Sequence, residues 1–186
     1  MIPDPENRIA RSEGLARLAI ENDWTPVRFY SGENSEKNVV TWAKIGHGPF
    51  HQAGFEQDLR DRMDNAPWFL SESSWLHAYA RNQRGVEFRG MIWHMSRCGS
   101  TVARNLLAAT DHSVVIAEPS LINEIMLTIQ KNPDGPGAGY LRSALQCFAR
   151  PDGNRLTRAY LKCTSWNVLL ADEMHAQATS VPCVFI

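Results

Sequence analysis

The second half of the chain alternates short apolar runs with amphipathic segments. Residues 114–117 form a continuous apolar run, which is typical of a strand buried on both faces of a sheet. Pro119 follows at a point where a helix can begin, because the first helical residue needs no backbone N–H. Strands that alternate with helices predict an α/β fold with a parallel sheet and right-handed crossovers. We expect strands over 88–95, 114–117, 158–163 and 181–186, and helices over 100–109, after Pro119, over 140–149 and over 166–177.

The first part of the chain follows a less regular pattern. Residues 5–21 are expected to be helical, and residues 38–45 alternate in the manner of a strand. Apolar residues spaced four apart over 55–63 predict one buried face of a helix. We therefore interpret residues 1–85 as a small, irregular α+β region of unassigned role that precedes the main domain over residues 86–186.

Composition and charge narrow the class of protein. The chain has 186 residues, of which 44% are hydrophobic and 21% charged, so it can bury a core and is not expected to be disordered. The formal net charge of −1 gives no reason to expect a nucleic acid or an anionic membrane as a partner. No apolar run is long enough to span a membrane, and the N-terminus does not read as a signal peptide. We expect a cytoplasmic protein, and the charge still allows a local basic site for a small anion.

The junction between the first expected strand of the main domain and the helix after it reads His-Met-Ser-Arg-Cys-Gly-Ser-Thr over residues 94–101. Unsatisfied backbone N–H groups at a helix start, together with the helix dipole, form a site for phosphate or sulfate. Gly99 lets the backbone approach an anion closely, Arg97 can pair with its oxygens, and Ser100 and Thr101 can add hydroxyl donors. The alternative is an ordinary strand-to-helix turn, in which Gly99 relieves the bend and Ser100 caps the helix.

A nucleotide-binding loop of the Walker A type would read G-x-x-x-x-G-K-[ST]. With Gly99 in the place of the second glycine, the first glycine position holds His94 and the lysine position holds Ser100. A P-loop kinase or NTPase is therefore an alternative that lacks its lysine. It would need Mg²⁺ held by Thr101 and by a carboxylate such as Glu118.

The same segment resembles the 5′-phosphosulfate loop of P-loop sulfotransferases, which typically reads P-[KR]-[ST]-G-[ST]-[ST]. The basic residue two places before the glycine is Arg97, whereas Ser96 replaces the proline and Cys98 the small hydroxyl residue. Bacterial sulfotransferase-like proteins commonly carry the Ser-Arg-Cys-Gly-Ser-Thr form. The resemblance covers roughly residues 86–186 and implies a three-layer P-loop fold, the cofactor 3′-phosphoadenosine 5′-phosphosulfate (PAPS) and a hydroxyl or amine acceptor. It also implies that the 5′-phosphate and sulfonate are held by Arg97, Cys98, Gly99, Ser100 and Thr101.

In that family, an Arg-Asp-Pro-like turn after the next strand and a downstream serine bind the 3′-phosphate. Here the corresponding position would fall just after Ile186. We therefore expect the sequence to be a piece of a longer domain. A truncated domain that binds an anion without turnover is the third hypothesis. The acceptor and the oligomeric state stay open at this point, because a fold does not fix its substrate.

Sulfonyl transfer needs a base that takes the acceptor's proton and a cation near the leaving phosphate. Arg97 is the expected cation. Glu118 is the expected base, because it directly follows the apolar run at 114–117 and should lie at the carboxyl edge of the sheet, where ligands bind. Some sulfotransferase families place a catalytic glutamate on the segment after the second strand, and Ala117-Glu-Pro119 looks similar. The alternatives for Glu118 are that it only favours the start of the next helix through the dipole, or that it lines a pocket without taking up a proton.

Several other polar residues are interpreted as structural or solvated. His94 precedes the loop on a strand and is expected to be structural rather than a base. Lys162 and Arg104 are expected to be solvated. His47 and His51 have the spacing of a metal pair on a helix, but the glycines and proline around them argue against a helix and hence against a metal site. The four cysteines contain no C-x-x-C pair, so neither zinc nor a disulfide framework is predicted.

Overall fold

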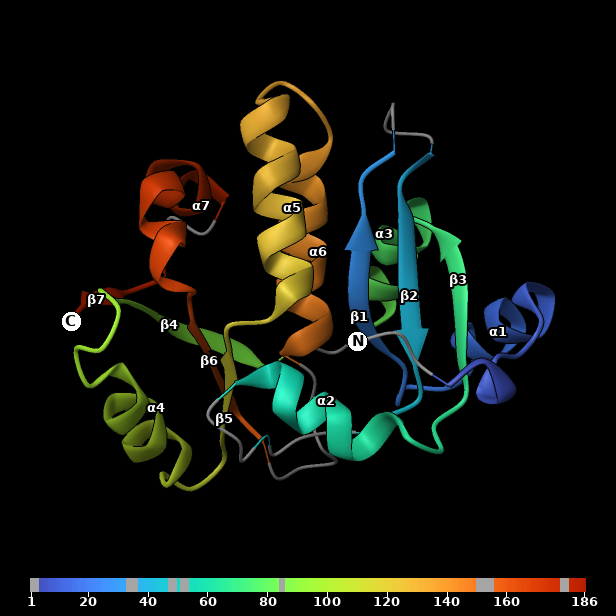
Figure 1. Cartoon of the computed structure of the whole chain (residues 1–186), viewed down its shortest axis with the longest axis horizontal. Helices are drawn as coiled ribbons and strands as arrows, with labels where there is room; N and C mark the ends of the chain where they lie inside the picture. The colour runs from blue at the N-terminus through green and yellow to red at the C-terminus, as the bar shows by residue number, and fades with distance from the viewer. Residues whose placement is uncertain are drawn as a thin grey trace.

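Four parallel strands form the sheet that the apolar runs predicted (Figure 1). The computed structural model describes residues 4–32, 37–46, 50, 54–83, 86–149, 156–177 and 181–186. The order of the strands across this sheet is β5-β6-β4-β7. Their bounds are β4 (Glu87–Trp93), β5 (Ser113–Ala117), β6 (Arg158–Lys162) and β7 (Cys183–Phe185). The predicted α/β class with a parallel sheet is confirmed.

Helices connect these strands and flank the sheet (Figure 1). They are α4 (Ser100–Ala108), α5 (Ser120–Lys131), α6 (Gly137–Phe148), the short 3-10 helix η3 (Ser165–Leu170) and α7 (Ala171–Gln177). The single helix expected over 166–177 is wrong in its first half. The Thr164 amide donates to Asn167 Oδ1 at 2.8 Å, and the Asn167 amide donates to the Thr164 backbone oxygen at 2.9 Å. These two bonds close a tight turn, so the chain enters η3 before α7 begins.

A second, antiparallel sheet lies in the N-terminal region, with the order β1-β2-β3. It contains β1 (Thr25–Tyr30), β2 (Val39–Ala43) and β3 (Trp68–Glu72), and the helical elements around it are η1 (Pro5–Asn7), α1 (Arg11–Leu18), α2 (Phe55–Met63) and α3 (Ser74–Asn82). The predicted α+β character of this region is confirmed. Of the three strands, only β2 was predicted from the sequence. Strand β3 begins with three consecutive apolar residues, Trp68, Phe69 and Leu70, so it lacks the alternation that identifies a half-exposed strand.

The continuous helix expected over residues 5–21 is wrong, because the segment is divided. Asp4 caps η1 by accepting a hydrogen bond from the Glu6 amide at 3.0 Å. The Ile9 amide then donates to the Trp68 backbone oxygen at 3.0 Å, and Arg8 forms a bridge with the same residue. This pairing holds the chain extended beside β3, so α1 starts only at Arg11.

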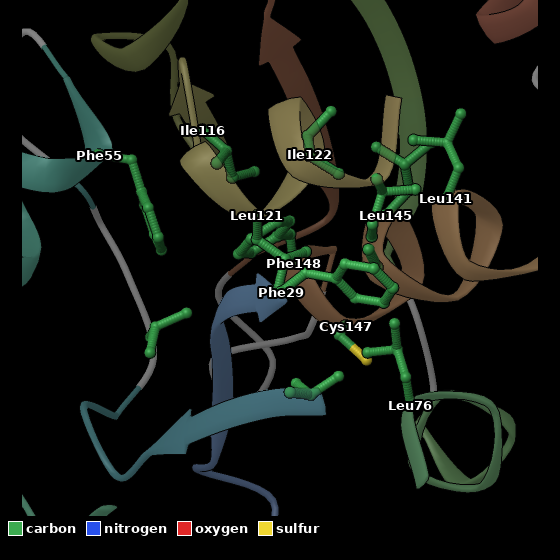
Figure 2. Close-up of a cluster of buried hydrophobic side chains, with 14 of the residues drawn as sticks. Phe29, Phe55, Leu76, Ile116, Leu121, Ile122, Leu141, Leu145, Cys147 and Phe148 are labelled. Carbon is green, nitrogen blue, oxygen red and sulfur yellow. The ribbon is translucent and has the colours of Figure 1, made fainter. Parts of the chain in front are cut away.

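The core is continuous between the N-terminal sheet and the helices of the main domain (Figure 2). Phe29 of β1 lies 5.4 Å, between ring centroids, from Tyr140 of α6. Phe55 of α2 meets Phe148 of α6 edge-on at 5.2 Å. Contacts of this kind bury large apolar areas, and α5 and α6 both pack against β1, so the helices of the main domain share one core with the N-terminal sheet.

Helix α4 places Arg104 on its buried side, opposite to the prediction that this residue is solvated. This residue is 2% exposed, and its Nη2 donates to the backbone oxygen of Phe50. Val102 and Leu106, by contrast, are 62% and 67% exposed. The prediction that Arg104 is solvated is therefore wrong, because its guanidinium donates to a backbone oxygen more than fifty residues away and lies near the negative charge of Asp58.

His77 of α3 should make stability depend on pH. Its Nδ1 lies 2.8 Å from Ser143 Oγ, and its ring stacks on Tyr140. Burial lowers the pKa of His77 from its ordinary value of 6.5, with Arg81 adding to the effect. Because the unfolded chain binds the proton more tightly, the stability that His77 contributes is present above pH 6.5 and is lost as pH falls through the lowered pKa. Denaturant unfolding over pH 7 to 5 should show this loss, and His77→Asn should make it smaller.

Candidate functional site

The ends of three neighbouring strands meet at the carboxyl edge of the parallel sheet. In the register of the sheet, Lys162 of β6 is level with Ala117 of β5 on one side and with Ile92 of β4 on the other. The residues just beyond these strand ends therefore lie close together. They include His94 and Glu118, which are 24 positions apart in the chain. Ligands bind along this edge in open α/β sheets, which makes it the candidate site.

The loop between β4 and α4 has an alternating backbone conformation. Arg97 and Gly99 have positive φ angles of 62° and 89°, and Cys98 between them does not have a positive φ. Alternation of this kind turns successive N–H groups toward one concave side, which is the geometry of an anion-binding nest. No described residue accepts a hydrogen bond from the backbone amides of Gly99, Ser100 and Thr101. These donors, at the start of α4, are available to an external anion.

The five predicted loop residues differ in exposure. Arg97, Gly99 and Thr101 are exposed, Cys98 is half-buried and Ser100 is buried. A Cβ built on Gly99 would meet nothing within 4 Å, so open space lies in front of the loop. The alternative in which the Ser100 side chain caps the helix is not observed, because the N-cap residue is Gly99 and no side chain makes a capping bond.

Glu118 is placed at the same edge by a strained backbone. Its φ is 55°, in the left-handed region that costs a residue with a side chain of order 1–3 kcal/mol. Its amide donates to the Lys162 backbone oxygen at 2.8 Å, which extends the ladder between β5 and β6 by one residue. The positive φ then turns the chain away from the sheet. Such outliers cluster at functional sites, although His112 also has a positive φ, in the turn between α4 and β5.

The Glu118 carboxylate contacts two basic side chains through one oxygen. Lys162 Nζ donates to Oε1, and His94 Nε2 lies 3.4 Å from the same oxygen. No described residue forms a hydrogen bond with Oε2. The side chain of Glu118 is 35% exposed, so this residue is partly open to solvent.

The prediction that Lys162 is solvated is wrong. The residue is 2% exposed, and its ammonium is compensated by Glu118. A buried lysine needs such a partner, because an isolated charge in the interior is very costly. No sequence pattern indicated the pair, since the two residues are 44 positions apart. His94 is also buried, in agreement with a structural role, yet it touches the same carboxylate.

Cys163 follows Lys162 at the end of β6. Burial raises the pKa of its thiol far above the ordinary value, so the thiol stays protonated and is a poor nucleophile. Ser120, at the start of α5, donates to Glu56 of α2, which pairs with Arg28 at 2.7 Å. Within the described ranges, no three His, Cys, Asp or Glu side chains are arranged to hold a metal ion. His47 and His51 lie outside those ranges.

Comparison of the chain with protein-family models, with curated proteins and with solved structures gave no match. Across the part of the chain that the structure describes, no helix is both long enough and apolar enough to cross a bilayer. The longest helices, α5 and α6, have 12 residues each.

Proposed function

We propose that this chain binds the 5′-phosphosulfate end of PAPS at the loop over residues 97–101 and transfers the sulfonate to a hydroxyl or amine of a small molecule. The observation that carries the proposal is the loop itself. The φ angles of Arg97 and Gly99 are positive and that of Cys98 is not, and the amides at the start of α4 lack acceptors among the described residues. The loop follows β4 at the carboxyl edge of the parallel sheet, the edge at which Glu118 follows β5. A tetrahedral oxyanion is the ligand that fits such donors.

The residues present fit the phosphosulfate end of the cofactor. Arg97 is exposed next to the loop amides and supplies a guanidinium that pairs with two oxygens at once. The open space in front of Gly99 leaves room for the anion. PAPS supplies the activated sulfonate, whereas the chain's own groups bind its oxygens and hold it in place. The two residues predicted to supply hydroxyl donors differ in exposure, since Thr101 is exposed and Ser100 is buried. In this proposal Thr101 binds the anion through its hydroxyl group and Ser100 through its backbone amide.

Glu118 is the base in this proposal. Lys162 fixes Oε1 and leaves Oε2 without a hydrogen bond to any described residue. The acceptor's O–H or N–H would donate to Oε2, and its proton would move there as the bond to sulfur forms. The leaving phosphate keeps the electron pair of the broken sulfur–oxygen bond, and Arg97 with the loop amides stabilises the charge that develops on it.

Replacing Gly99 by alanine tests the loop geometry. At a φ of 89°, a residue with a Cβ is strained by about 1–2 kcal/mol, although nothing lies within 4 Å of that Cβ. If the loop relaxes, its amides turn away from the anion. We expect adenosine 3′,5′-bisphosphate to bind the variant about 5- to 30-fold more weakly than wild type, as measured by calorimetry.

Gly54→Ala is the matched control. Gly54 is also the N-cap of a nine-residue helix and also has open space around its Cβ, but its φ is −135°. Its bisphosphate affinity should stay within twofold of wild type. Equal affinities for the two variants would remove the loop from the site. If the wild-type protein does not bind the bisphosphate but turns over ATP with Mg²⁺, a phosphotransferase is supported instead.

A further inference from the structure

The strained turn at Glu118 needs support on both sides. Its φ of 55° is in the left-handed region, and a residue with a side chain stays there only where its surroundings keep it there. On the strand side, the Glu118 amide donates to the Lys162 backbone oxygen at 2.8 Å. On the helix side, the chain continues through Pro119, which is buried and has a φ of −68°, and enters α5 at Ser120. A contact that fixes the start of α5 therefore also fixes this turn.

Glu56 of the N-terminal region contacts the start of α5. The Ser120 hydroxyl donates to Glu56 Oε1, whereas Pro119, the N-cap residue, makes no capping bond through its side chain. The other oxygen of Glu56, Oε2, accepts from Arg28 Nη2 at 2.7 Å. The three bonded residues come from α5, α2 and β1, and α2 lies at the lower end of α5 in Figure 1, where that helix begins. Because both oxygens of Glu56 have partners, this carboxylate is a structural acceptor rather than a second base.

The charge of Glu56 is compensated where it lies. Its side chain is 31% exposed and that of Arg28 is 22% exposed, so both keep part of their hydration. Glu56 is in the first turn of α2, and its Oε1 accepts from the first residue of α5. The positive ends of two helix dipoles therefore favour a negative charge at this point. Hydrogen bonds to a charged acceptor are stronger than those between neutral groups, so the bond from Ser120 is suited to fix a turn.

Helix α2 provides a fixed support for Glu56. Phe55, the preceding residue, is buried and meets Phe148 of α6 edge-on at 5.2 Å. The first turn of α5 is also anchored in the core, through the buried side chain of Leu121. These apolar contacts hold the two helices in place, but hydrophobic contacts are non-directional. The hydrogen bond between Ser120 and Glu56 adds a directional contact at the point where the strained turn ends.

We propose that Glu56 is a positioning residue that keeps Glu118 in its strained turn by holding Ser120, two positions later in the chain. Arg28 orients Glu56, so β1 and α2 of the N-terminal region take part in building the site at the edge of the parallel sheet. The use of Glu118 as a base rests on the proposed function, whereas the hold on its backbone does not.

Hydrogen exchange at single backbone amides, followed by NMR, measures this hold. In Ser120→Ala, the Glu118 amide should exchange about tenfold faster than in wild type, because a hydrogen bond to a charged group is lost. The Cys163 amide, which donates to the Ile92 backbone oxygen at 3.0 Å, is the reference, and its exchange should change by less than about twofold. Ser120→Thr keeps a hydroxyl group and should return the Glu118 amide to within about threefold of wild type.

Ser74→Ala is the matched control. Ser74 is exposed and, like Ser120, is the first residue of a helix, in this case α3. Its replacement should leave exchange of the Glu118 amide within about twofold of wild type. If Ser120→Ala accelerates the Glu118 and Cys163 amides equally, or leaves the Glu118 amide unchanged, the proposal is overturned.

Combining Glu56→Ala with Ser120→Ala tests whether the two residues act through one contact. Exchange of the Glu118 amide in the double variant should stay within about threefold of the faster single variant. If the two accelerations multiply instead, the residues act separately and Glu56 does not position the turn through Ser120. A wild-type protein that does not bind adenosine 3′,5′-bisphosphate would end the proposed function without altering these exchange results.

Discussion

Replacing Glu118 by glutamine is expected to lower the free energy of unfolding by about 3 kcal/mol at pH 7. The variant leaves the Lys162 ammonium without a negative partner, although only 3% of the lysine side chain is exposed. Removal of one member of a buried ion pair usually costs about 3–5 kcal/mol. We expect the lower end of this range, because Glu118 is 35% exposed and water can reach part of the pair. Denaturant titration followed by circular dichroism measures the difference.

A second substitution should reverse most of this loss. Lys162→Met removes the buried charge and keeps an unbranched apolar side chain of similar length. The double variant Lys162→Met with Glu118→Gln should therefore regain stability to within about 1 kcal/mol of wild type, since replacing a whole buried pair is often neutral. Glu124→Gln, a half-buried carboxylate for which no ion pair was found among the described residues, should change stability by less than about 0.5 kcal/mol. If Glu118→Gln is no more harmful than this control, the ion pair does not matter for stability.

Replacing Arg97 by glycine is expected to weaken binding of adenosine 3′,5′-bisphosphate by about 10- to 100-fold. A hydrogen bond to a charged group contributes about 1.5–3 kcal/mol, and tenfold in affinity corresponds to about 1.4 kcal/mol. Glycine is chosen because Arg97 has a φ of 62°, which glycine adopts without strain. The substitution therefore removes the guanidinium and keeps the loop backbone. Calorimetry at constant salt gives the affinity.

Two variants complete this test. Arg97→Ala removes the same guanidinium but keeps the backbone strain, so the difference in affinity between it and Arg97→Gly reports the backbone alone. Arg60→Ala deletes an exposed arginine on α2 and should alter the affinity by less than twofold. Unchanged binding in Arg97→Gly would show that the cation takes no part, even if Gly99→Ala weakens binding.

The parallel sheet could be predicted because its strands carry their own signal. Residues 114–117 are apolar at every position, as a strand buried on both faces requires, and β5 occupies 113–117. The start of α5 could also be predicted, because Pro119 marks a place where a helix can begin. The loop was found from its residue pattern between the first strand and the first helix of the main domain. Gly99 was expected to let the backbone approach an anion closely, and the structure gives it a φ of 89°, which glycine adopts without strain. Its proposed use by PAPS stays a prediction.

The N-terminal region was harder to read because its elements depend on one another. Strand β1 pairs with β2 and packs against α5 and α6 from the other half of the chain. Arg8 and Ile9 are held extended by Trp68, about sixty positions later, which divides a segment with helical propensity. Local propensity is a weak guide where distant partners determine the conformation.

The sequence by itself determined where the strands of the parallel sheet run and where a glycine allows the chain to turn, because both depend on the residues of one short segment. Whether an isolated polar side chain is buried or solvated was decided only by the tertiary structure. Lys162 and Arg104 would be solvated if they stood alone, and each is buried because the fold supplies partners: Glu118 for the lysine, and the Phe50 backbone oxygen with the nearby charge of Asp58 for the arginine. The free energy of burying a charge depends on its nearest partner in space, and for these residues that partner comes from a distant part of the chain.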